Sequence, residues 1–192
     1  MSIDFLVSVL DSMENPARVN RNNAANIVLE QPNLLTELVN LTFSITQEVS
    51  VKAAWVLEWI CTHHGIAHIH SHLTTFTHNI SKLTFDSAIR PCAKICEHLA
   101  IAYTSKKQNS TQCILTDEYI DLIIETGFDW LITDQKTAVK AYTMNTLYLF
   151  GLQKTWIHPE LEHLITTKII HESSGCAARG RKILSLIRKN NT

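Results

Sequence analysis

Glycine and proline are scarce in this chain of 192 residues, which contains five glycines and four prolines. A fold of many short strands needs more turn residues than this, so the composition favours long helices and an all-α protein. Charge of either sign is also in short supply. The net charge of -1 at pH 7 gives the molecule as a whole no attraction to nucleic acid or to an anionic membrane, so a basic function has to be local.

Long apolar runs are missing too, and we expect no signal peptide. No stretch approaches the roughly 18 uninterrupted apolar residues of a membrane span, and the N-terminal run carries the acid Asp4 and no basic residue. The five cysteines are an odd number and lie mostly in apolar runs, where a reduced cysteine packs as a small hydrophobe. We therefore predict a cytoplasmic protein with no membrane segment.

Signatures of catalysis are absent from the sequence. It has no glycine-rich phosphate loop, no Gly-x-Ser-x-Gly elbow and no His-Glu-x-x-His motif. With 45% hydrophobic residues the chain is apolar enough to bury a core. We therefore expect a folded protein that binds without covalent chemistry and uses no cofactor, and we rank an enzyme behind two binding functions.

The sequence does contain a repeated pattern, clearest in Glu48–Ile60. An acid is followed three residues later by a branched or small apolar residue, and then directly by a base. Copies of the pattern end in Ala17-Arg18, Val51-Lys52, Ile89-Arg90, Val139-Lys140 and Ala178-Arg179, the last two being looser. Positions 18, 52, 90, 140 and 179 are 34, 38, 50 and 39 residues apart, which is the period of two-helix repeats.

Apolar stripes with helical spacing place the helices between these markers. We predict helices over residues 3–13, 16–29, 33–45, 47–64, 66–80, 89–103, 117–132, 137–152, 159–170 and 176–188, the first and last being caps. Gly65 breaks the second unit, Ile45 belongs to a buried stripe, and Pro91 and Pro159 occupy the first turns of their helices, with Pro159 at the first helical position. The polar run Ser105–Gln112 is predicted to be an exposed loop insertion.

The acid, the Val/Ile-Lys/Arg pair and the small residues after it, as in Asp86–Ala93 and Val139–Ala141, resemble the first helix of a HEAT repeat. The resemblance covers residues 14–188. It implies a right-handed α-α superhelix of about four HEAT-like helix pairs with terminal capping helices, forming a single domain over residues 1–192, often with acid–base ladders between neighbouring units. Similar arrays serve mostly as protein-binding scaffolds, and one related group, the alkylpurine-glycosylase-like repeats, binds damaged DNA.

Two tryptophans four residues apart, Trp55 and Trp59, flank the acid Glu58. They could form an aromatic platform beside a carboxylate, as in a nucleobase site. We favour the simpler interpretation, in which the rings pack against the adjacent repeat and Glu58 faces solvent.

Histidines 64, 68 and 72 also have helical spacing and could together hold zinc. Gly65 separates His64 from the other two, and no carboxylate lies near to orient an imidazole. We therefore expect no metal site, with His68 and His72 on the solvated face of an amphipathic helix whose buried stripe runs from Ile66 to Ile80.

One basic patch stands at the end of the chain, where Arg179, Arg181 and Lys182 are followed by Arg188 and Lys189 and no acid follows Glu172. Such residues could contact phosphates, or they could complement a helix C-terminus. The candidate binding residues are therefore Trp55, Glu58, Trp59, His68, His72, Arg179, Arg181 and Lys182. We predict a non-enzymatic scaffold that binds a protein partner on one face, with a DNA-repair type of nucleic-acid binding through the basic patch as the alternative.

Overall fold

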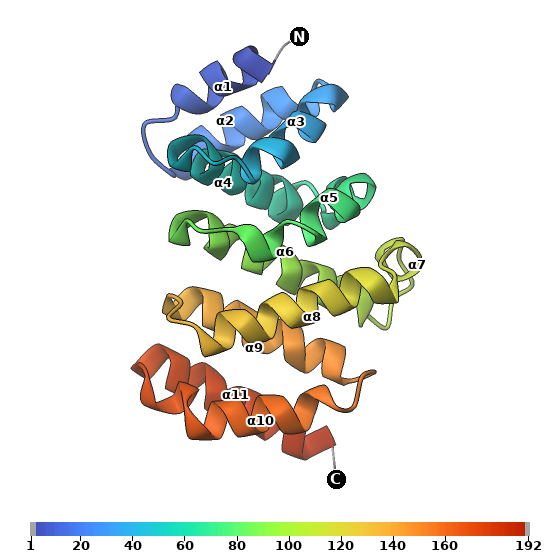
Figure 1. The fold of residues 1–192 in the computed structure, drawn as a ribbon. Coiled ribbons are helices and arrows are strands. Elements are labelled where there is room, and N and C mark those ends of the chain that lie inside the picture. Colours follow the sequence, from blue (N-terminus) through green and yellow to red (C-terminus); the bar gives the residue numbers. More distant parts are fainter. Residues whose placement is uncertain (1–2, 191–192) are drawn as a thin grey trace. The chain divides into compact units, whose positions relative to one another are not determined.

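The computed structural model describes residues 3–190, and it is 79% helical with no strand in that range. The all-α prediction is confirmed. Eleven α-helices and three short 3-10 helices follow one another along the described residues (Figure 1). None of these helices is both long and apolar enough to cross a membrane.

The chain divides into two compact units, Met1–Ile95 and Cys96–Thr192, hereafter unit 1 and unit 2. The boundary lies inside α6 (Asp86–Tyr103). Unit 1 also holds α1 (Ile3–Asp11), α2 (Arg18–Leu29), α3 (Pro32–Thr42), α4 (Gln47–His63), η1 (Ile66–His72), α5 (Leu73–Thr77) and η2 (Ile80–Lys82). Unit 2 holds α7 (Thr111–Ile114), α8 (Asp117–Ile132), α9 (Thr137–Gly151), α10 (Ile157–Thr167), η3 (Ile169–His171) and α11 (Ser174–Asn190).

Helix α4 is the centre of unit 1. It packs against α1, α2, α3 and η1, so eleven of its seventeen residues are buried and the helix is not simply amphipathic. Ala53 and Ala54 are fully buried, and their small side chains let the neighbouring helices approach closely. This burial explains why the repeated pattern is clearest in α4, because its residues are constrained on nearly every side.

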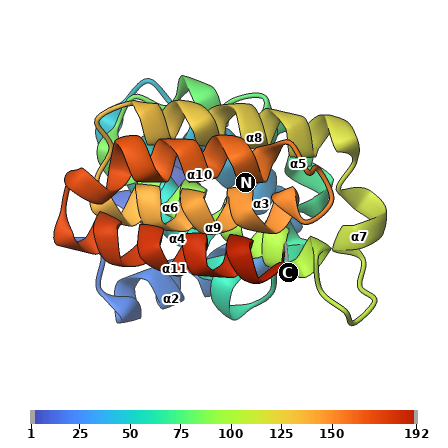
Figure 2. The same ribbon diagram turned by 90° about the horizontal axis from the view of Figure 1, so that it is seen from below.

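Helix α9 has the same place in unit 2. It packs against α8, α10 and α11, and Figure 2 shows it between α10 and α11. Lys140 lies on this central helix and is itself buried, although it is charged. A buried ammonium group needs a partner, and the structure supplies one from a distant segment, as described below.

The segment after Gly65 differs from the prediction. Gly65 does break the chain, since α4 ends at His63 and Gly65 has a φ of +117°, which side chains disfavour. Beyond it, however, the predicted single α-helix over 66–80 is the 3-10 helix η1 followed by α5 and η2. Its apolar residues Ile69, Leu73, Phe76 and Ile80 are nevertheless buried, although they are spread over all three short helices.

Three local predictions are wrong. Ile45 lies beyond the end of α3 and is 95% exposed, because Thr42 already ends the helix. Pro91 lies in the second turn of α6, which begins at Asp86, and Pro159 is the third residue of α10, not the first. The loop prediction is confirmed over Ser105–Ser110, but Thr111 is buried and starts the short helix α7.

Candidate functional site

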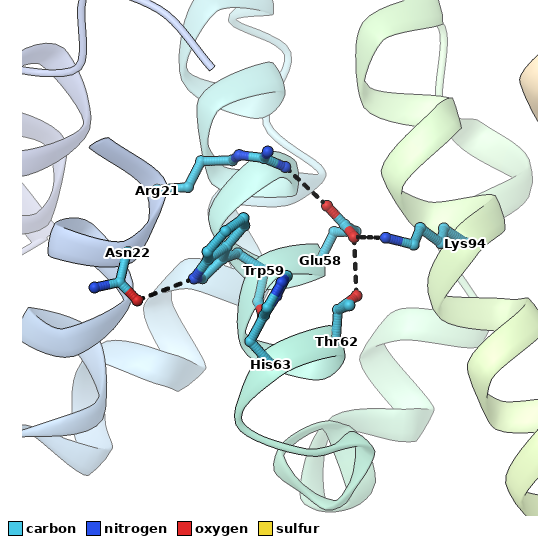
Figure 3. A network of polar contacts seen from close by, with 7 residues as sticks. All are labelled: Arg21, Asn22, Glu58, Trp59, Thr62, His63 and Lys94. Atoms are coloured by element: carbon cyan, nitrogen blue, oxygen red, sulfur yellow. Dashed lines mark hydrogen bonds and ion pairs between the residues drawn. The ribbon is translucent and has the colours of Figure 1, made fainter. Parts of the chain in front are cut away.

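Glu58 joins three helices of unit 1 through its carboxylate. Its Oε2 accepts a hydrogen bond from Arg21 of α2 at 3.2 Å, and its Oε1 accepts one from Lys94 of α6 at 2.5 Å. Thr62, one turn further along α4, donates to the same Oε1 at 2.9 Å. Figure 3 shows the carboxylate between the two cationic groups, so both of its oxygens are occupied.

The expectation that Glu58 faces solvent is wrong, since its residue is only 6% exposed. Sequence periodicity could not show this, because the partners Arg21 and Lys94 lie 37 and 36 residues away. Burial raises the pKa of Glu58, but the hydrogen bonds from Lys94 and Thr62 and the charges of Lys94 and Arg21 outweigh it. The pKa of Glu58 therefore lies below its ordinary value, and the carboxylate is charged at neutral pH.

Trp59 packs against α2, as the simpler interpretation predicts. Its indole Nε1 donates to Asn22 Oδ1 at 3.3 Å, and the guanidinium carbon of Arg21 lies 4.6 Å from the ring centroid. The imidazole of His63 stacks on the indole with 3.7 Å between ring centroids. The indole of Trp59 thus has Arg21 and His63 packed against it, and the residue is only 8% exposed. It is a structural element and not an open platform (Figure 3).

Trp55 has a different environment. It is half-buried and lines a cavity of about 350 Å³ on the surface of unit 1. The other lining residues are Gln47, Glu48, Val51, Lys52 and Ser87. The ammonium group of Lys52 pairs with the carboxylates of Glu48 at 2.8 Å and Asp11 at 3.7 Å. The structure thus separates the two tryptophans, leaving Trp55 available to a ligand.

The histidines do not converge. Residues four apart share a face of an α-helix, but His68 and His72 lie in the 3-10 helix η1, where three residues make a turn. Both are half-buried, and burial lowers the pKa of His72, so the expectation of a fully solvated face is wrong for this residue. Among residues 3–190 no three His, Cys, Asp or Glu side chains are grouped as a metal site would require.

The basic patch lies on α11. Arg181 and Lys182 are exposed, whereas Arg179 is half-buried, and α11 contains no acidic residue to offset them. Arg188 is paired with Glu162 of α10 at 3.3 Å. Besides Arg188, the patch therefore offers the exposed cations Arg181, Lys182 and Lys189, which is a modest electrostatic footprint.

Sequence reasoning missed a polar cavity of about 340 Å³ in unit 2. The buried Lys140 lies in its lining and donates to both carboxylate oxygens of Glu172, each at 2.6 Å. The repeat pattern itself does not indicate Glu172 as the partner of Lys140. Only the 32-residue separation of Lys140 from Glu172, close to a repeat length, could have indicated the true partner.

Comparison of the chain with protein-family models, with curated proteins and with solved structures found no match.

Proposed function

We propose that the chain is a HEAT-like scaffold, a right-handed α-α superhelix of about four helix pairs, that binds a protein partner on one face. The cavity beside Trp55 carries this proposal. Tryptophan is among the residues that contribute most to binding energy in protein interfaces, especially in a concave setting. A half-buried Trp55 at a cavity of 350 Å³ has the position of such an anchor.

The spacing of contacts within unit 1 supports the repeat part of the proposal. Arg21 and Glu58 are 37 residues apart, Glu58 and Lys94 are 36 apart, and Asn22 and Trp59 are 37 apart. Each contact joins successive pattern-bearing helices at nearly equivalent positions. An acid–base ladder of this kind is what the resemblance to HEAT repeats implies.

The same network favours binding over catalysis. Ion pairs and hydrogen bonds join α4, which carries Trp55, to α2 and α6 before a partner binds. A surface that is ordered in advance loses less conformational entropy on binding. The carboxylate of Glu58 is buried and paired with two cations, and its lowered pKa makes it a poor general base.

Quantitative affinity capture from the native host tests the proposal. We expect a protein retained by the natural chain to be depleted about tenfold or more by Trp55→Ala, because losing an interface tryptophan commonly costs about 2 kcal/mol. Trp156→Ala is the matched control, since Trp156 is 53% exposed and belongs to unit 2. Equal capture by the natural chain and Trp55→Ala, after nuclease treatment, would contradict the proposal.

The alternative function is nucleic-acid binding of a repair type through α11. The exposure of Arg181 and Lys182, with no acid on that helix, favours it. The engagement of Glu58 and Trp59 within unit 1 weighs against a nucleobase site at those residues. We therefore place this alternative second.

A further inference from the structure

The two tryptophans of α4 lie about one turn apart and have different contacts. The guanidinium carbon of Arg21 lies 4.6 Å from the ring centroid of Trp59, and the same guanidinium donates to the neighbouring carboxylate of Glu58 (Figure 3). Among the described residues no ring stacks on Trp55, no cation lies over its indole and no hydrogen bond reaches it. One indole of the helix thus receives an arginine from within unit 1, and the other receives none.

A carboxylate accompanies Trp55 on the same face of α4. Glu48 and Trp55 are seven residues apart, which is nearly two turns of an α-helix, and both line the cavity of about 350 Å³. Glu48 is exposed, and among the described residues only its Oε1 has a partner, the ammonium group of Lys52 at 2.8 Å. The second oxygen of Glu48, Oε2, is therefore open to another cation.

The charge around this cavity is negative on balance. Lys52 is the one cation in the lining, and it has two carboxylates near it, those of Glu48 and, at 3.7 Å, of Asp11. The side chain of Lys52 is 11% exposed, whereas those of Glu48 and Asp11 are 70% and 55% exposed. A ligand therefore meets exposed negative charge and a shielded positive charge, and Coulomb attraction favours a cationic ligand.

The rest of the lining suits a long side chain with an apolar stem. Val51 is buried and supplies apolar surface, and Gln47 and Ser87 supply neutral polar groups. Arginine combines an apolar stem with a planar cation that stacks on aromatic rings and donates hydrogen bonds to carboxylates. Lysine suits the cavity less well, because its compact ammonium group is strongly hydrated and cannot stack.

From the uncovered indole of Trp55, the open oxygen of Glu48 and the negative surroundings, we propose that this cavity receives an arginine side chain of the protein partner. The guanidinium lies over the indole and donates to the carboxylate. Arg21 makes the same pair of contacts with Trp59 and Glu58 in the same helix. The inference rests on the proposed function, since it names the side chain that the partner contributes.

NMR spectroscopy of the full chain tests the proposal with two probes, the Nα-acetyl amide of arginine and that of citrulline, its neutral isostere. The indole N–H signal of Trp55 is the one that Trp55→Phe removes. We expect the arginine probe to shift this signal with a Kd of about 10 mM or tighter, and the citrulline probe to leave it unchanged. No shift with about 50 mM arginine probe, an equal shift with citrulline, or tighter binding of the corresponding lysine probe would each overturn the proposal.

A matched pair of variants places the arginine probe at Glu48. Glu48→Gln should weaken its binding by about threefold to fivefold, because an exposed ion pair is lost. Glu30→Gln changes an exposed carboxylate of unit 1 outside the lining and should leave the binding unchanged. Unchanged binding by Glu48→Gln, or the same weakening by both variants, would overturn the site. Thermal unfolding of each variant verifies that it is folded.

Affinity capture from the native host separates this inference from the proposed function. Glu48→Lys should deplete the captured partner by about tenfold, because it places a like charge against the arginine, while Glu30→Lys should not. Loss of the partner with Trp55→Ala but not with Glu48→Lys would overturn the arginine assignment and leave the proposed function standing. Full retention of the partner by Trp55→Ala would contradict the proposed function and this inference with it.

Discussion

Replacing Glu58 with glutamine should destabilise unit 1 while preserving the shape of the side chain. The natural carboxylate is 7% exposed and pairs with Arg21 and Lys94, whose side chains are 21% and 28% exposed. Removing one partner of a fully buried ion pair costs about 3–5 kcal/mol. Both cations here can recover part of their hydration, so we expect a loss of about 2–3 kcal/mol, a large fraction of a typical stability of 5–15 kcal/mol.

Urea unfolding followed by tryptophan fluorescence measures this loss, with Glu30→Gln as the control at an exposed carboxylate. The pH dependence has a definite sign. Because the pKa of Glu58 is lowered in the folded state, its contribution is present above the ordinary value of 4.5 and is lost as the pH falls through the folded pKa. The difference between the natural chain and Glu58→Gln should therefore shrink in acid. A loss below about 0.5 kcal/mol at pH 7, or a difference that grows in acid, would refute the role of the network.

Three further outcomes are expected. Ala93→Glu should lower the free energy of unfolding by several kcal/mol, because Ala93 is 1% exposed and the new charge would have no partner; unchanged thermal unfolding would contradict that burial. Elemental analysis of tag-free protein should find less than stoichiometric zinc, and the double change His68→Ala with His72→Ala should leave the melting temperature nearly unchanged. Nucleic-acid binding should be weak and unselective at physiological salt. If binding is strong instead, charge reversal at Arg181 and Lys182 should flatten the slope of the logarithm of the binding constant against the logarithm of the salt concentration by up to about two units. Each phosphate contact contributes about -0.9 to that slope.

Helices with one apolar face were predictable from the sequence. The predicted helix over residues 117–132 is confirmed as α8, Asp117–Ile132. The failures are local. The apolar residues of η1 also fit the spacing of an α-helix, and Ile45 continues the apolar spacing of α3 after that helix has ended. Periodicity reports which residues seek burial, and it does not report the hydrogen-bond pattern or the exact end of a helix.

Polar residues on the central helices were harder to predict. Glu58 and Lys140 are both charged residues, and a charged side chain is usually exposed. Their burial depends on Arg21, Lys94 and Glu172, each more than 30 residues away in the sequence. The repeat period could suggest such partners, but only the packed structure identifies which residues meet.

The central claim is that a protein partner binds at the cavity beside Trp55, and site-specific photo-crosslinking tests it most directly. A photo-reactive phenylalanine analogue would replace Trp55 in one variant and Trp156 in the other, each expressed in the native host. A protein scaffold that binds through the Trp55 cavity predicts a discrete protein crosslink at position 55 and none of that kind at position 156. Crosslinks at position 55 only to nucleic acid, or the same protein crosslinked at both positions, would contradict the account.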